Sequence, residues 1–493
     1  MMAVKRNTVV PKDNPRNIKP VRVHKYARRA MKIYGSYTIE NRAVPDFRDG
    51  LKPVMRRILY AAYDLNLNHS SKPKKSARLV GEVIGKYHPH GDTSVYDSAE
   101  TLVNSATPSL IGEGNWGSLN SGKAAQRYTN VKLSKYGQET FFSKDYIDVV
   151  RMCPNFDGTL KEPVILPSIL PNILINGAEG IAVGAVSNIP SFDPKGVAEL
   201  ISICLKNGTV TVAECEKHLK FHYRYGGVPL LKTKLRRKEF RNLLKFGTGS
   251  IEFKPNLTIS EDNKQVVING IPPHLNPDKA METLLSKPYI KAAWDNADKH
   301  TKKKGILVQF IAQLKKTQGM EFEDCVTDIG KIFSGTMHYK INLTVRKYSA
   351  LKEEAHASFK SMGIIRLIEK WTKWRVALEK RMLSFKIKEY EKKITYQELI
   401  LLIVNNLEIF FKALKQKGSE NASEIYLMKQ LKLTENQASI VMGLTGRQLR
   451  SYNEKALRQQ IDDLHLEIKQ FVSDRKNPNK RISLQTLKLV QQL

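Results

Sequence analysis

The sequence has few cysteines, and their spacing argues against two kinds of small stabilised domain. The 493-residue chain has four, at Cys153, Cys204, Cys215 and Cys325, and no two of them form a CxxC pair. A zinc module needs Cys or His ligands at short fixed spacings, and a disulfide scaffold needs a higher cysteine density. The pattern therefore favours a reducing compartment.

Long apolar runs are also missing. No segment approaches the roughly 18 consecutive apolar residues of a membrane-spanning helix, and the first residues lack the apolar core of a signal peptide. We therefore expect a soluble, cytoplasmic protein without a membrane partner. A chain of 493 residues is too long for one hydrophobic core, so about two to four domains are expected.

Acidic residues are scarce relative to basic ones. The chain has 48 Asp and Glu against 81 Lys and Arg, a formal net charge of +33. Such an excess destabilises a compact chain by self-repulsion unless a polyanion relieves it, so a nucleic acid or an anionic membrane is the first partner to consider. The alternative is a basic protein from a lysine-rich proteome, whose charge only solvates its surface.

Hydrophobic spacing predicts helices in the first third of the chain. Residues 1–25 are polar and basic and are expected to form an extended arm. Apolar residues at spacings of three and four predict helices after Lys52, after Pro73 and after Gly91, the last with Asp92 as its N-cap. Three short helices with a basic rim suggest a helix-turn-helix-like unit, although another small bundle would give the same pattern.

The centre of the chain has β character and the last third is helical. Prolines and glycines in 163–190 predict short strands joined by tight turns, and 226–345 predicts an α/β domain. Apolar spacings of three and four recur in 368–385 and 457–471. These two segments are either an antiparallel coiled coil or two amphipathic helices packed on a core.

Three segments carry the strongest functional signal. They are RAVPDFRDGLKPVMRRILYA at 42–61, KKSARLVGEVIGKYHPHGDTSVYD at 74–97, and GEGNWGSLNSGKAAQRYTNVKL at 112–133, which is followed by NGAEGIAVG at 176–184. Together they closely resemble the breakage-reunion subunit of bacterial type IIA DNA topoisomerases, the gyrase A and topoisomerase IV A-subunit family. The resemblance runs from about residue 26 to about residue 475 and is far more specific than one short motif.

The resemblance implies an α+β multidomain fold. After the arm (1–25) it implies a winged-helix-type DNA-cleavage domain (26–160), an α/β tower domain with an intercalating hairpin (161–360), a long antiparallel coiled coil with a helical dimer gate (361–475) and a short basic tail (476–493). It also implies a homodimer in which each copy cuts one strand of a duplex. A second duplex then passes through the break, which relaxes or decatenates DNA.

The resemblance makes Tyr128 and Arg127 the catalytic residues. A tyrosine hydroxyl has a pKa of about 10 and is a poor nucleophile at neutral pH unless it is activated. The adjacent guanidinium can stabilise the phenolate and the charge on the phosphate. A transient 5′-phosphotyrosyl link conserves the free energy of the phosphodiester, so the strand can be resealed without ATP at that step. Without the surrounding match, one Arg-Tyr pair among 19 tyrosines would be read as surface decoration.

A second group of residues is expected to contact DNA. The HPHGD segment lacks the further Cys or His of a zinc site, and it precedes a predicted helix N-terminus, where N–H groups and the helix dipole favour a phosphate. The resemblance implies these DNA contacts: Arg42, Lys52, Arg56, Arg57, His88 and His90. For Arg56 and Arg57, an ordinary solvated helix face is the alternative.

Three further positions are assigned by the resemblance. Ile181, among glycines, is either a packing residue turned inward or an apolar wedge that enters between base pairs and bends the DNA. Thr93 and Asp97 lie four residues apart and share one helix face. In the resembling enzymes such a pair holds fluoroquinolones through a water–magnesium bridge; the alternative is that the pair only caps the helix.

Parts of the complete reaction are not visible in the sequence. It has no Walker A loop and no carboxylate cluster beside the tyrosine segment, so we expect no metal or cofactor on this chain alone. The resemblance places ATP and Mg²⁺ on an ATPase/TOPRIM-type partner, in an A2B2 heterotetramer on double-stranded DNA. The chain ends soon after the second long helix, so no DNA-wrapping domain and no negative supercoiling are expected.

The compact form of the chain also resembles phage-encoded type II topoisomerases, which would place it in a bacterial cytosol or in that of an infected host. Two rival functions stay open. One is a DNA clamp that keeps the fold without turnover, against which the presence of both Arg127 and Tyr128 argues without proving activity. The other is a recombination nuclease with a tyrosine of the archaeal type VI topoisomerase kind, whose motifs do not match.

Overall fold

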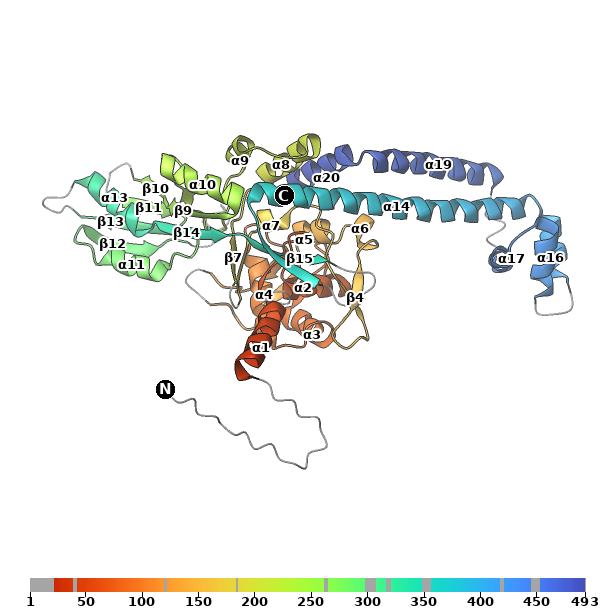
Figure 1. Cartoon of the computed structure of the whole chain (residues 1–493), viewed down its shortest axis with the longest axis horizontal. Helices are drawn as coiled ribbons and strands as arrows, with labels where there is room; N and C mark the ends of the chain where they lie inside the picture. The colour runs from red at the N-terminus through yellow and green to blue at the C-terminus, as the bar shows by residue number, and fades with distance from the viewer. Residues whose placement is uncertain are drawn as a thin grey trace, which may run out of the picture.

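The computed structural model describes residues 22–38, 42–118, 122–182, 185–260, 265–297, 307–315, 321–347, 356–416, 421–444 and 453–492. The molecule is elongated, with a central body, a lobe of strands and short helices at one end and a pair of long helices at the other (Figure 1). Residues 1–21 of the predicted arm lie outside the described residues. Residues 22–25 were wrongly predicted to belong to the extended arm, because α1 (Val23–Thr38) begins among them.

The predicted helices of the first third are confirmed and share one core with a small sheet. The helices are α2 (Pro53–Asp64), α3 (Ser76–Lys86) and α4 (Asp92–Asn104). The antiparallel sheet has the order β1 (Lys74–Lys75), β3 (Asn130–Leu133), β2 (Leu110–Glu113). Ile58, Val83 and Val95 bring the three helices together, because each is fully buried in this core. Asp92 was wrongly predicted as an N-cap: Gly91 occupies that position without a side-chain bond, and Asp92 is the first helical residue.

The middle of the chain forms a further part of the body and a five-stranded sheet. Its first elements are α5 (Lys135–Phe141), α6 (Lys144–Ile147), β4 (Met152–Pro154), β5 (Lys161–Pro163) and α7 (Asn172–Ile175). The sheet has the order β6 (Ala178–Ala182), β7 (Ala185–Ile189), β14 (Gly335–Lys340), β9 (Thr248–Lys254), β8 (Val228–Pro229). The helices α8 (Pro194–Asn207), α9 (Val212–His218) and α10 (Lys234–Phe246) belong to the same region. The strands predicted in 163–190 are therefore present, with α7 between them.

The lobe at one end has a core of its own. Its antiparallel sheet has the order β10 (Asn256–Ile259), β11 (Gln265–Asn269), β13 (Gln309–Leu314), β12 (Ile290–Asp295). The helices α11 (Pro277–Leu285) and α13 (Phe322–Ile332) belong to this lobe, and Ile268, Leu284 and Phe310 are buried in it. The hairpin β15 (Asn342–Lys347) and β16 (His356–Ser361) then returns the chain to the body (Figure 1). Strands alternate with helices here, as predicted for 226–345.

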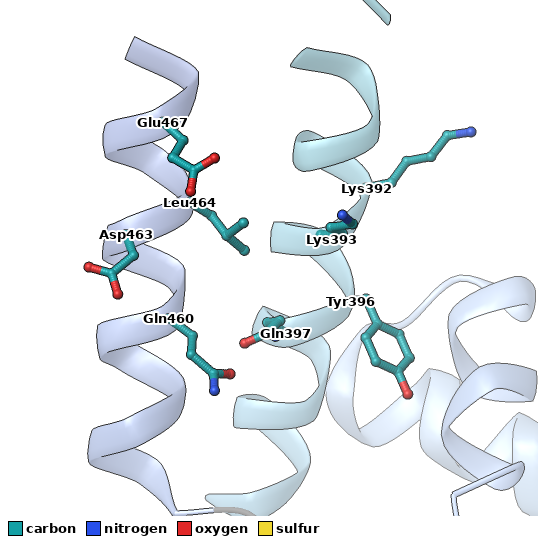
Figure 2. A pocket seen from close by; sticks show the side chains of 8 residues that line it. All are labelled: Lys392, Lys393, Tyr396, Gln397, Gln460, Asp463, Leu464 and Glu467. Atoms are coloured by element: carbon teal, nitrogen blue, oxygen red, sulfur yellow. The ribbon is translucent and has the colours of Figure 1, made fainter. Parts of the chain in front are cut away.

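The long helices are α14 (Ile364–Val404) and α19 (Glu454–Lys476). The first half of α14 is buried in the main core, and its second half runs antiparallel to α19, where the rings of Tyr390 and Phe471 lie 5.3 Å apart. Leu464 and Gln460 of α19 point toward α14 beside an open groove of about 440 Å³, whereas Lys392 points away (Figure 2). At the far end lie α15 (Leu407–Leu414), α16 (Ala422–Leu431) and α17 (Glu435–Met442).

The segment predicted as a short basic tail is mostly helical. It contains α20 (Asn479–Gln491), which turns back onto the body. Ile482 and Val490 are buried there, and the Ser483 hydroxyl lies 2.9 Å from that of Ser202 on α8. No single helix among the described residues is long and apolar enough to cross a membrane; α14 and α15 pass that test only as a pair bent by 85°.

A buried polar network joins α6, α14 and α20. Glu379 Oε2 accepts hydrogen bonds from the Tyr146 hydroxyl at 2.6 Å and from Arg375 at 2.7 Å, and Glu379 Oε1 accepts one from Arg481 at 2.9 Å. Arg375 also donates to Gln485 at 2.9 Å. Burial raises the pKa of Tyr146 to about 12. Because Arg375 and Glu379 are fully buried, each charge depends on its partners in this network.

Candidate functional site

Tyr128 lies in a tight turn directly before β3. Its backbone N–H donates to the carbonyl of Ala125 at 2.9 Å, and the residue is 64% exposed. The guanidinium carbon of Arg127 lies 4.7 Å from the centre of the tyrosine ring. A cation over the ring keeps positive charge beside the phenol without covering the side chain. The structure therefore brings the two predicted catalytic residues together on an accessible surface.

The tyrosine turn is fixed to the helical unit on both sides. The next residue, Thr129, is buried, and its hydroxyl lies 2.8 Å from both the Tyr96 hydroxyl and the Ser76 Oγ. The N–H of Ser76, the first residue of α3, donates to the carbonyl of Thr129 at 3.0 Å. Gln126 in the turn donates its amide N–H to the Asp92 carboxylate at the start of α4, at 2.9 Å. The backbone of the turn is thus held while the Tyr128 side chain stays open.

The segment between α3 and α4 carries a second group. Arg57 on α2 donates from Nε and Nη2 to the two carboxylate oxygens of Glu162, each at 2.7 Å, and its Nη1 lies 3.0 Å from His88 Nδ1. The His88 and His90 rings stack at 4.5 Å. Burial lowers the pKa of His88 to about 4, and the positive charges of Arg57, His90 and Arg42 act in the same direction. His88 is therefore neutral at pH 7.

Arg56 lies apart from this group, and its prediction as a DNA contact does not fit the structure. The residue is only 3% exposed. Its Nε and Nη2 donate to the Asp49 carboxylate at 2.6 and 3.0 Å, and Nη2 also reaches the Leu51 carbonyl at 3.1 Å. Successive helical residues point about 100° apart, so Arg57 faces outward while Arg56 faces the core. The alternative of a solvated helix face fails for Arg56 too.

Ile181 lies on β6, which pairs with β7, and its exposure excludes one of its two interpretations. Its side chain is 82% exposed, opposite the half-exposed Val186. The strand is seated closely on the segment that carries Arg42, because a Cβ at Gly180 would lie 1.9 Å from the Ala43 carbonyl oxygen. Only glycine permits this approach. Ile181 is therefore not a core residue, and an apolar side chain is left at the surface.

Lys52 and Asp97 line a shared cavity of about 690 Å³ between α2, α4, β6 and β7. Burial lowers the pKa of Lys52, against the opposing effect of the Glu179 carboxylate. Thr93 and Asp97 are both exposed near the start of α4. Lys123 places its Nζ 2.5 Å from both Asp97 and Glu100. Since Gly91 is the N-cap and no side chain caps the helix, the cap interpretation of the Thr93 and Asp97 pair is not supported.

Sequence reasoning missed three residues that organise these groups: Glu162, Gln126 and Lys123. Their partners lie 105, 34 and 26 residues away in the chain, so no local motif marks them. Lys123 and Gln126 fall within the quoted tyrosine segment, but nothing in the sequence shows that they reach α4. The described residues contain no group of three or more His, Cys, Asp or Glu that could hold a metal ion.

Comparison with known proteins gives a consistent result. The family described as the DNA gyrase/topoisomerase IV A-subunit matches residues 42–489. The DNA topoisomerase 4 A-subunit is 30% identical over 456 residues in Salmonella typhimurium, covering 90% of this chain and 58% of the relative, and 30% identical over 472 residues in Escherichia coli K12, covering 93% and 60%. The DNA gyrase A-subunit of Thermotoga maritima is 29% identical over 440 residues, covering 88% and 53%. The chain thus spans little more than half the length of these relatives. It belongs to the DNA gyrase/topoisomerase IV A-subunit family.

Proposed function

We propose that this chain is the DNA-cleaving and rejoining subunit of a type IIA topoisomerase and that Tyr128 is its nucleophile. The observation that carries the proposal is the exposed Tyr128, with Arg127 over its ring, on a turn fixed to α3 and α4. The phenol loses its proton and its oxygen bonds to the phosphorus, while the 3′ oxygen of the cut strand leaves and is protonated. The reverse reaction reseals the strand. Arg127 stabilises the charge on the phosphate.

DNA contacts are proposed around this tyrosine. Arg42 and His90 are exposed, His88 stacks on His90 and contacts Arg57, and Lys52 lines the neighbouring cavity. The net charge of +33 favours a polyanion bound over an extended surface. Arg57 joins the group through His88. The exposed Ile181 is the proposed wedge between base pairs, whose unstacking costs a few kcal/mol that a larger wrapped surface offsets.

The family resemblance also suggests roles for the larger parts of the molecule. We propose that 26–160 is a winged-helix-type cleavage domain, 161–360 the tower, and 361–475 a coiled coil that ends in a dimer gate. Exposed apolar side chains at the far end of the long helices support a gate between two copies; they are Phe411, Leu414, Ile425 and Ile440. A homodimer would bury these side chains. ATP and Mg²⁺ belong to an ATPase/TOPRIM-type partner in an A2B2 assembly.

The proposed function is tested by reconstitution with such a partner. The chain alone should bind double-stranded DNA but neither cleave it efficiently nor hydrolyse ATP. With the partner, Mg²⁺ and ATP, it should relax and decatenate DNA, and denaturant should trap a covalent adduct. Mass spectrometry of the digested adduct should place the 5′-phosphate on Tyr128. Attachment at another residue, or ATP-driven strand passage by the chain alone, would contradict the proposal.

Ile181→Ala should reduce DNA bending and cleavage with little effect on stability. The side chain is 82% exposed, so its loss should change the free energy of unfolding by no more than about 0.5 kcal/mol. A core isoleucine would instead cost about 2–5 kcal/mol. Fluorescence energy transfer across a labelled duplex measures the bend, and thermal melting measures stability. The matched control is Ile259→Ala, an exposed isoleucine of β10; equal bending by both variants would refute the wedge.

Fluoroquinolone sensitivity should depend on Thr93, Asp97 and Lys123. We propose that Thr93 and Asp97 hold the water–magnesium bridge to the drug, so Thr93→Leu and Asp97→Asn should weaken drug-stabilised cleavage. Lys123 pairs with Asp97 and therefore competes with Mg²⁺ for that carboxylate. Lys123→Met should strengthen drug-stabilised cleavage by at most about fivefold, because an exposed ion pair contributes up to about 1 kcal/mol. Cleavage is titrated with drug, and drug-free relaxation is the control. The same drug response in all three variants as in the wild type would exclude the bridge.

A further inference from the structure

The hydrogen bond between Arg57 and His88 fixes the proton of the imidazole. A guanidinium has N–H donors and no acceptor, so an arginine can only donate. Arg57 Nη1 lies 3.0 Å from His88 Nδ1, and Nδ1 must therefore be the unprotonated, accepting nitrogen. The ring proton of the neutral imidazole is then on Nε2. The geometry alone thus defines one tautomer of His88, with a single N–H donor on the side of the ring away from Arg57.

Glu162 holds Arg57 in the orientation that produces this tautomer. Its carboxylate takes the forked Nε and Nη2 edge of Arg57 with two bonds of 2.7 Å. The Glu162 side chain is only 12% exposed, and its strand β5 is paired with β4, where Cys153 lies opposite Glu162. A bidentate pair of this kind restricts both the position and the plane of the guanidinium. Arg57 is therefore directed toward His88 with its fork already occupied.

The charges around His88 oppose its protonation. Arg57 faces it from α2, His90 stacks on it from the same segment, and Arg42 acts on it from the segment before α2. Glu162, the acidic group on the neighbouring strand, is paired with Arg57. Burial and these positive charges hold the pKa of His88 at about 4. A second proton on Nδ1 would also break the bond from Arg57.

We propose that Arg57 is a positioning residue, clamped by Glu162, that acts on DNA through His88 by holding it as a neutral Nε2–H donor to a phosphate oxygen. The inference rests on the proposed function, because it assigns DNA to this surface. It changes the role of Arg57 from a direct phosphate contact to a support for His88. It also means that the His88 contact keeps the same charge between pH 5.5 and pH 8.0, unlike that of an ordinary histidine.

The test is DNA affinity as a function of pH, measured by anisotropy on a labelled duplex under conditions without cleavage. Wild type and His88→Gln should show the same pH dependence, since other histidines contribute equally to both. Arg57→Met removes the donor and one of the positive charges, so the pKa of His88 should rise from about 4 toward its ordinary value, against the burial and the charges of His90 and Arg42 that remain. Lowering the pH from 8.0 to 5.5 should then tighten binding at least about threefold, because charge-assisted hydrogen bonds are the stronger ones. Arg57→Met/His88→Gln should not show this tightening of DNA binding at low pH.

Two further variants complete the design. Arg57→Met leaves Glu162 without its partner, which could unfold the protein. Arg57→Met/Glu162→Leu therefore replaces both charges by apolar groups, and it should show the same tightening of DNA binding at low pH. Glutamine carries a neutral N–H near the place of Nε2 and asparagine is too short, so His88→Gln should lose less affinity than His88→Asn. Two results would overturn the proposal. One is a wild type in which binding tightens at low pH in a way that depends on His88; the other is no tightening at low pH in either Arg57 variant. Absence of a Tyr128 adduct would count against the proposed function alone.

Discussion

Tyr128→Phe should abolish covalent DNA cleavage while DNA binding stays nearly unchanged. The substitution removes one hydroxyl, the proposed nucleophile, and keeps the ring beneath Arg127. The turn is held by Thr129, Gln126 and Ser76, none of which bonds to the phenol, and Tyr128 is 64% exposed, so the fold should not respond. Loss of a nucleophile lowers the rate of a covalent step on the order of a thousandfold or more.

The measurement is the yield of 5′-linked adducts on a denaturing gel, with affinity determined on the same duplex. Tyr396→Phe is the matched control, because Tyr396 is an exposed tyrosine in the half of α14 that extends beyond the main core (Figure 2). The control should cleave like the wild type. Adducts at normal yield from Tyr128→Phe would remove this tyrosine from the mechanism and with it the proposed chemistry.

Glu379→Ala should cause the largest loss of stability, about 3–5 kcal/mol in the free energy of unfolding. Glu379 is fully buried, and its removal leaves the buried Arg375 without its anionic partner and leaves Arg481 only its longer ion pair with Asp474, at 3.3 Å. The Tyr146 hydroxyl loses its acceptor on Glu379 as well, so the junction of α6 with α14 should loosen. The cost comes mainly from the uncompensated charge, because a buried ion pair is itself a weak source of stability.

Urea unfolding measures this loss, and Glu454→Ala is the control. Glu454 pairs with Arg458 at the same spacing of four residues, but both side chains are largely exposed, so its removal should cost less than about 1 kcal/mol. The double variant Glu379→Leu/Arg375→Met should recover part of the loss, since both charges are then absent. If Glu379→Ala were as stable as the Glu454→Ala control, the buried network would not make the predicted contribution to the free energy of unfolding.

The parts of the fold that follow local patterns were predictable. The three helices around Ile58, Val83 and Val95 follow from apolar spacing alone. Asp92 was misplaced by one position because the sequence offers both Gly91 and Asp92 before the apolar stripe. Arg375 stands at an apolar position of its helix, and periodicity could not reveal that Glu379, one turn later, is buried with it. Burial of charge depends on tertiary partners.

The proposed catalytic pair of the candidate site could be named from the sequence, but the organisation of the site could not. Tyr128 and Arg127 were identified by the surrounding match, and the structure places them in contact. Arg56 and Arg57 are adjacent and chemically identical, so only the packing of α2 separates the buried residue from the accessible one. Glu162 gave no signal, because it meets Arg57 from 105 residues away.

The length of α14 has a mechanical consequence. Its 41 residues form one unbroken helix, which at 1.5 Å per residue is a rod of about 60 Å. One end is embedded in the main core and the other carries α15, α16 and α17. The 17 residues after Ile387 extend about 26 Å beyond the main core, so a tilt of about 10° where the helix leaves the core would displace the far end by about 5 Å. A small rotation of the core that holds α14 would therefore give a larger movement of α15, α16 and α17 at the far end.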